Sequence, residues 1–384
     1  MNGLKKRGGL FVLLLAFALI VAACSSDSDD TTTTAAVAET TTTEAPTTTE
    51  APTTTEAPTT TEAPFEAPEG ALVSYPVDAA PALDGVADDA AWVDATEIAV
   101  GVAGGSNSGA ADVTLKSVHS GDMVYFLVSW DDPTQSFLRS PWEKQADGTW
   151  AQKKDPDDKG GDNNVWYEDK MSLIWNIDNS IPDFEAVGCF SACHAGEDPD
   201  AKPYGNKYTQ EEGQLGDIWH WKSVRNLNQV DDQYLDFTRY SPDTPGAGRH
   251  GDPKDGGGYV NNRTEEGSLP AYMAPDGGSK DGAPGYILDS EKVEFDDSVF
   301  AVGDLLPGIY KAEFTGDRGD ISAGFAYADG IWTVEIGRKL VTGSEFDVQF
   351  DDMAGLYHFG VATFDNAQVR HSYQNGVNPF VFKP

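Results

Sequence analysis

The sequence predicts a mainly β protein whose folded part is a β-sandwich. Residues 113–118 alternate apolar and polar side chains, a Gly121-Asp122 turn follows, and residues 123–130 are apolar on both faces. This is the pattern of a hairpin that enters a sheet buried on two sides. Turns rich in Gly, Asp and Pro separate further short strands, which favours two packed layers of sheet.

The other strands follow the same period of two, at residues 171–177, 332–336 and 357–361. Between residues 182 and 282 there is little alternation and many turn residues. We expect this stretch to be a long, partly helical insertion over the sandwich, because long ordered loops in compact domains usually carry function.

The N-terminal segment has the features of an export signal. Lys5, Lys6 and Arg7 precede a short apolar stretch over residues 10–22, and Val-Ala-Ala-Cys ends at Cys24. Such a stretch is short for a membrane span and typical of a signal peptide. We expect residues 1–23 to be removed and Cys24 to carry lipid, which predicts an extracytoplasmic protein anchored at the periplasm or cell surface. An uncleaved anchor, or cleavage without lipidation, is the alternative.

Residues 24–70 are predicted to be a disordered linker. Thr-Thr-Thr-Glu-Ala-Pro repeats with a six-residue period, and such a sequence has too few apolar side chains to form a core. The folded domain is therefore expected over residues 71–384.

The composition excludes one class of partner. With 26 basic and 63 acidic residues the net charge is −37. Nucleic-acid binding needs clustered Lys and Arg, so no nucleic-acid partner is expected.

One motif carries chemistry. Cys189-Phe190-Ser191-Ala192-Cys193-His194 holds two thiols followed at once by a histidine. In c-type haem attachment, thiols bond to the haem vinyl groups and the adjacent imidazole binds iron. Here three residues separate the cysteines instead of the usual two. The motif predicts one covalent haem per chain, with His194 as proximal ligand. A local disulfide between the two cysteines, or a zinc site, is the alternative.

A second segment, residues 216–222, is unusually aromatic. The near-helical spacing of Ile218, Trp221 and Val224 favours a short packed helix. Alternatively, Trp219, His220 and Trp221 form one wall of the haem site, where indoles would exclude water from the iron and His220 would bond a propionate.

Several motifs occur in one order along residues 71–384. They are Leu83-Asp84-Gly85 with Trp92, 130–134, the cysteine motif, 217–222, Trp332-Thr333-Val334-Glu335, 338–340, 364–366 and Arg370-His371-Ser372. In this order they resemble the haem-binding domain of ethylbenzene dehydrogenase gamma subunits and related cytochrome c-552/DMSO-reductase-type proteins. The resemblance implies a β-sandwich that holds one haem and passes electrons. Family members that serve molybdenum enzymes hold haem b through a methionine and a late lysine, whereas this chain has thiols and histidine.

The resemblance places the family's late lysine near His371, which is therefore our first choice of distal ligand. Met273 is the alternative ligand, or else a methionine that fills a gap in the core. Residues 155–160 resemble the start of a calcium loop, but Trp166 stands where the loop's Glu is expected, so we interpret them as an acidic loop.

Together these features predict a lipid-anchored monohaem c-type cytochrome that transfers electrons and is not an enzyme by itself. Its expected partner is a redox protein, either a molybdenum oxidoreductase or a membrane respiratory complex. The alternative function is a non-redox module that binds carbohydrate or another ligand, with the two cysteines in a disulfide.

Overall fold

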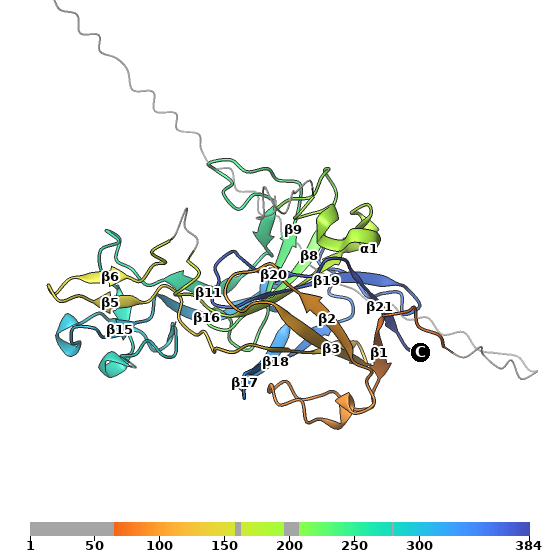
Figure 1. The fold of residues 1–384 in the computed structure, drawn as a ribbon, viewed down its shortest axis with the longest axis horizontal. Helices are drawn as coiled ribbons and strands as arrows, with labels where there is room; N and C mark the ends of the chain where they lie inside the picture. Colours follow the sequence, from red (N-terminus) through yellow and green to blue (C-terminus); the bar gives the residue numbers. More distant parts are fainter. Residues whose placement is uncertain (1–64, 158–162, 196–206, 279) are drawn as a thin grey trace, which may run out of the picture. The chain divides into compact units, whose positions relative to one another are not determined.

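The computed structural model describes residues 65–157, 163–195, 207–278 and 280–384. Figure 1 shows that strands dominate this part of the chain. The predicted signal segment and almost all of the predicted linker lie outside the described residues. Within them, no helix combines the length and the apolar character needed to cross a membrane.

One 13-stranded sheet forms the body, in the order β10-β9-β8-β7-β19-β21-β1-β3-β4-β18-β17, with β2 beside β3 and β20 beside β19. Its strands, in chain order, are β1 (Leu72–Pro76), β2 (Ile98–Val102), β3 (Ala111–Ser120), β4 (Met123–Asp131), β7 (Lys170–Asn176), β8 (Gly216–Lys222), β9 (Asp231–Leu235), β10 (Arg249–Gly251), β17 (Ser322–Ala328), β18 (Ile331–Lys339), β19 (Tyr357–Phe364), β20 (Ser372–Tyr373) and β21 (Asn378–Phe382).

The sheet folds over so that its two halves face each other. Phe126 of β4 lies 5.8 Å from Trp175 of β7 and 5.4 Å from Trp219 of β8, measured between ring centroids. Trp332 of β18 lies 5.0 Å from Trp221 of β8. The aromatic core therefore sits between two layers, and the predicted β-sandwich is confirmed.

Small sheets and short helices complete the described chain. The small sheets are β11 (Gly256–Asn261) with β16 (Ile309–Thr315) and β13 (Ile287–Leu288); β15 (Leu305–Leu306) with β5 (Trp142–Lys144) and β6 (Trp150–Gln152); and β12 (Tyr272–Met273) with β14 (Val293–Glu294). The helices are α1 (Phe184–Val187) and the 3-10 turns η1 (Ala90–Trp92), η2 (Ile177–Asn179), η3 (Gly188–Ser191), η4 (Pro275–Gly277), η5 (Asp297–Val299) and η6 (Asp317–Gly319).

The prediction of a helix at residues 216–222 is wrong, because this segment is strand β8 between β7 and β9. Every residue of β8 is buried, so polar residues occur on both faces and the period of two is hard to see in the sequence. The predicted insertion also supplies β9 and β10 to the main sheet. Only α1, η3 and η4 are helical in its described part.

Candidate functional site

The cysteine motif lies on a compact turn against the main sheet. It follows α1 and occupies η3, and Gly188 enters the turn at φ 54°. A Cβ on Gly188 would lie 2.4 Å from the carbonyl oxygen of Gly376, so the turn requires glycine here. Cys189 and Cys193 pack on an apolar cluster that includes Ile174 and Ile218. Neither cysteine is in a disulfide bond.

The structure places His194 and His371 side by side. Their ring centroids are 5.5 Å apart, with an interplanar angle of 72°. Metal–imidazole nitrogen bonds are about 2.0–2.1 Å long, so two imidazoles on opposite sides of one metal ion have centroids roughly 6 Å apart. The two rings thus come within about 1 Å of the separation that two axial ligands need.

Aromatic rings surround this pair. Tyr373 lies 5.0 Å from the ring of His194 and 6.0 Å from that of His371. Phe190, inside the cysteine motif, lies 5.3 Å from His194, and Phe364 lies 5.1 Å from His371. Such rings exclude water and offer flat apolar surface, which suits an aromatic macrocycle.

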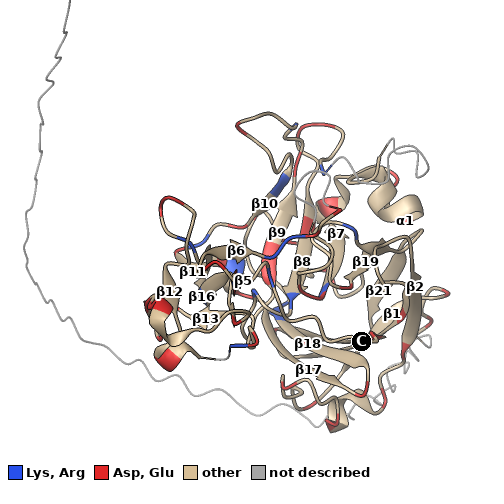
Figure 2. Cartoon of the chain, turned by 60° about the vertical axis from the view of Figure 1, so that its left-hand side comes forward, with Lys and Arg blue, Asp and Glu red and all other residues tan. Residues whose placement is uncertain are grey.

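His220 continues the same row of rings, because it stacks on Phe364 at 5.4 Å. Its Nδ1 accepts a hydrogen bond from Arg249, whereas its buried Nε2 has no hydrogen-bond partner. Lys170 is also buried, and its Nζ lies 3.8 Å from the centroid of the same Phe364 ring. Figure 2 shows positive charge on β10, the strand that carries Arg249, although the chain as a whole is acidic.

Burial and neighbouring groups keep the side chains of His371, His220 and Cys189 uncharged at neutral pH. Burial, with His194 and Arg249 nearby, lowers the pKa of His371 to about 3. Burial and the neighbouring cations Lys222 and Arg249 hold the pKa of His220 well below its ordinary value. Burial and Cys193 raise the pKa of the Cys189 thiol to about 12. At neutral pH the site therefore offers neutral imidazole lone pairs and a protonated thiol.

The residues present fit a haem by their chemistry: two thiols, two imidazoles side by side, and an unpaired nitrogen on a third imidazole, whose other nitrogen bonds an arginine. The pocket between Gly104–Ser106 and His371, which His194 and Tyr373 also line, has a volume of about 90 Å³. Pockets for small molecules and cofactors measure roughly 300–1,000 Å³. A porphyrin would therefore need more room than this pocket provides.

Two predicted wall residues are not part of this arrangement. Trp219 and Trp221 point to the opposite face of β8 from His220, into the core between the two layers. Asp217, on the same face, accepts a hydrogen bond from Trp219 Nε1 at 3.0 Å. The structure thus brings His220 to the site and leaves both indoles in the core.

The alternative ligand Met273 is also elsewhere. It lies in β12 within a small cluster formed with Trp142, Trp150, Phe300 and Leu306, and it does not line the pocket of His194. Its described surroundings are those of a methionine that fills a core.

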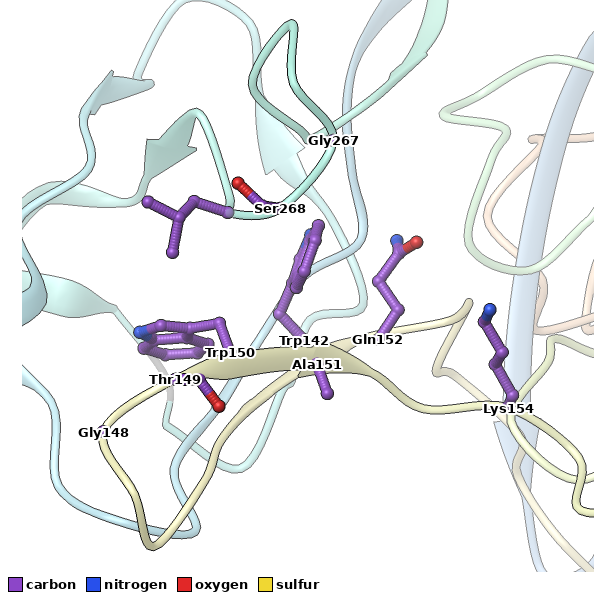
Figure 3. A pocket seen from close by; sticks show the side chains of 10 residues that line it. Trp142, Gly148, Thr149, Trp150, Ala151, Gln152, Lys154, Gly267 and Ser268 are labelled. Carbon is purple, nitrogen blue, oxygen red and sulfur yellow. The ribbon is translucent and has the colours of Figure 1, made fainter.

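A larger pocket of about 790 Å³ lies on the small sheet β15-β5-β6, where Trp142, Trp150, Gln152 and Leu269 are among its lining residues (Figure 3). The exposed fractions of Trp142 and Trp150 are only 3% and 6%. Their indole nitrogens donate to Asn262 O and to Asp297 Oδ1 at 2.6 and 2.7 Å. The pocket therefore lacks an exposed tryptophan face on which a sugar ring could stack.

Sequence reasoning missed Phe190, Phe364, Tyr373, Lys170 and Arg249. Phe364 stands inside a motif noted above, and Tyr373 follows the Arg-His-Ser motif, so position beside known motifs could have indicated both. No pattern in the sequence distinguishes Lys170 or Arg249. Cys24 lies outside the described residues, and so do residues 158–160 of the acidic loop.

Comparison with known proteins gives one family. The sequence model of the ethylbenzene dehydrogenase family matches residues 87–376. No curated protein matches. Among solved structures, a family 9 carbohydrate-binding module from Caldicellulosiruptor kristjanssonii in complex with glucose is 9% identical, with a TM-score of 0.30, over 81% of this chain and 95% of that chain.

A putative carbohydrate-binding protein from Bacteroides uniformis is 8% identical, with a TM-score of 0.32, over 81% of this chain and 98% of that chain. At these scores neither likeness carries an argument about this protein. The family match, in contrast, extends over the cysteine turn, the paired histidines and most strands of the main sheet. The chain belongs to the ethylbenzene dehydrogenase family.

Proposed function

We propose that this chain is an extracytoplasmic, lipid-anchored electron-transfer protein that carries one covalently attached haem. The observation that carries the proposal is the pairing of His194 with His371 at 5.5 Å, although the two are far apart in sequence and His194 directly follows Cys193 in the cysteine motif. Family membership supports it, because the resemblance described above concerns haem-binding subunits.

Each residue has a defined role in this proposal. Cys189 and Cys193 would hold the porphyrin through thioether bonds, and His194 and His371 would supply the imidazoles that bind its iron. His220 and Arg249 would bond the propionates, because His220 Nε2 lacks a partner and Arg249 supplies positive charge. Tyr373 and Phe364 would exclude water from the rings of both histidines.

A bound haem would supply one-electron chemistry. Two protein ligands at the iron leave no position for a substrate, which favours electron transfer over catalysis by this chain alone. Family membership suggests a molybdenum oxidoreductase as partner, and a membrane respiratory component is the other candidate. The non-redox alternative, a carbohydrate-binding module, has weaker support. It predicts a disulfide between Cys189 and Cys193, which are not in a disulfide here, and the tryptophans that line the larger pocket are buried.

The test of the proposal is covalent attachment. The full chain, produced in a host with a cytochrome c maturation system, should keep haem-dependent peroxidase staining after denaturing electrophoresis. The double variant Cys189→Ala/Cys193→Ala should lose the stain, and Cys24→Ser should retain it because this cysteine is outside the motif. Haem that passes completely into acidified organic solvent would refute covalent attachment, and two covalent haems per chain would refute a single site.

A further inference from the structure

Three aspartates converge inside the sheet, away from the cysteine turn. Asp217 comes from β8, Asp232 from β9 and Asp347 from the segment before β19, and each offers a carboxylate oxygen within 4.8 Å of the others. The exposed fractions of these three residues are 0%, 0% and 1%. Asp252, which is 2% exposed, follows β10, and its backbone N–H donates to Asp232 O at 3.1 Å.

Many oxygens of this cluster, here called the Asp217 cluster, have no hydrogen-bond partner. They are Asp217 Oδ1, Asp232 Oδ2, both oxygens of Asp252 and Asp347 Oδ1, whereas Asp347 Oδ2 forms an ion pair with Arg338. A buried carboxylate oxygen without a partner costs free energy, so native proteins pair such atoms with donors, water or ions. The unpaired atoms therefore indicate a missing positive ligand.

One cation of the described chain lies in the cluster. Arg338 Nη2 is 3.1 Å from Asp347 Oδ2 and 3.9 Å from Asp217 Oδ2, while Nη1 donates to Val348 O. The guanidinium thus faces the Oδ2 atoms and leaves Oδ1 of both aspartates unmatched. Four buried carboxylates against one guanidinium leave the cluster strongly negative if all are ionised. Burial and mutual repulsion accordingly raise the pKa of Asp217 to about 7 and of Asp252 to about 9.

A second buried group of three aspartates shows that convergence of acidic residues alone does not indicate a missing cation. Asp132, Asp169 and Asp365 also converge within 4.8 Å. Their oxygens, however, accept hydrogen bonds from the backbone N–H groups of Thr134, Ser136, Asn366 and Ser108 at 2.6–3.1 Å. None of their oxygens is among the unpaired buried atoms of the described chain. Among the residues that the structure describes, only the Asp217 cluster combines convergence with unpaired oxygens.

We propose that the Asp217 cluster binds one Ca²⁺ ion. Calcium takes six to eight oxygen ligands at about 2.3–2.6 Å, so two of its ligands can be up to roughly 5 Å apart, and the three aspartates each offer an oxygen within 4.8 Å of the others. Magnesium keeps several of its waters and fits a fully buried all-carboxylate cluster less well. The ion would tie β8, β9 and the segments that carry Asp252 and Asp347 together, independently of any haem.

The experiment measures Ca²⁺ binding by the full chain. Protein stripped with EGTA and dialysed should bind one Ca²⁺ per chain in calorimetric titration, and its melting temperature should rise on adding Ca²⁺. Asp347→Asn should weaken binding at least tenfold. The matched control is Asp131→Asn, which removes an exposed carboxylate at the opposite end of β4 from the partner of Arg338, Val124, and should leave the dissociation constant unchanged.

A second readout does not need a variant. Trp219 Nε1 lies 3.0 Å from Asp217 Oδ2, so Tb³⁺ in the cluster should luminesce when indole is excited, and Ca²⁺ should displace it. Absence of Ca²⁺ binding by stripped wild-type protein, together with absence of indole-sensitised Tb³⁺ emission, would overturn the proposal and leave protons as the neutralising ligand. Equal affinity in wild type and Asp347→Asn would overturn the assignment to this cluster.

Discussion

At the scale of single residues, the candidate haem site depends on contacts between distant parts of the sequence. His194 comes from the turn after α1, whereas His371 precedes β20, and Tyr373 touches both rings. The cysteine motif could be identified from sequence because its chemistry is local. His371 was predicted only from its place in a family pattern, and Arg249 could not be predicted, because strand pairing in three dimensions brings it to His220.

His371→Ala tests the second axial position. We expect a change from a low-spin to a high-spin spectrum and new binding of carbon monoxide, while covalent haem persists because both thiols remain. The matched control is Met273→Ala, which removes the other candidate ligand from a separate cluster and should leave the spectrum unchanged. A sulfur-to-iron charge-transfer band in the oxidised wild-type spectrum would contradict the assignment.

At the scale of elements, the structure explains why separated motifs occur together. Glu335 of β18 is fully buried, and its carboxylate accepts hydrogen bonds from the N–H groups of Asp84 and Gly85 and from Trp92 Nε1, at 2.8–3.0 Å. Gly85 has φ 79°, and a Cβ there would lie 2.3 Å from the backbone of Phe325. The early Leu-Asp-Gly motif and the late Trp-Thr-Val-Glu motif are thus one structural contact.

The sequence predicts that the chain is mainly strands, but it does not predict every segment that becomes a strand. The hairpin of β3 and β4 has turn residues and alternation that are both local. β8 is buried on both faces, and His220 and Lys222 occupy positions where a single sequence suggests exposure. Their burial depends on Arg249 and Asp231, which come from neighbouring strands and therefore leave no local signal.

The ends of three elements meet at Asp132, Asp169 and Asp365, and this junction should make stability depend on pH. Burial raises the pKa of Asp132 to about 6 and, with Asp132 nearby, that of Asp169 to about 8. Because these folded-state values exceed the unfolded value of about 4, the folded protein holds extra protons between them. The free energy of unfolding should fall as pH rises from about 4 through about 6 for Asp132 and about 8 for Asp169, by at most about 1.4 kcal/mol per proton and pH unit.

Asp132→Asn should flatten this dependence, since the amide oxygen can still accept from Thr134 N–H and the charge is gone. Urea denaturation at several pH values, with calcium held constant, measures the effect. Asp131→Asn, an exposed neighbour, is the control and should behave like wild type. A wild-type stability that rises between pH 6 and 8 would contradict the prediction.

At the scale of the whole molecule, the net charge of −37 and the predicted lipid on Cys24 bear on where the protein works. A lipidated chain should partition into the detergent phase of a cloud-point extraction. Cys24→Ser should move to the aqueous phase or persist as an uncleaved precursor, whereas Cys193→Ala should partition like wild type. Equal incorporation of a fatty-acid analogue into wild type and Cys24→Ser would exclude Cys24 as the acceptor.

The position of β21 has a consequence for how the chain folds. β21 pairs with β19 on one side and with β1 on the other, in parallel, and so joins the two halves of the main sheet. β21 follows every other strand in chain order. The two halves of the main sheet therefore cannot join through β21 until nearly all of the described chain has been synthesised. Contacts between such distant segments slow folding. We therefore expect the two halves of the main sheet to join only late in folding, after β21 has been synthesised.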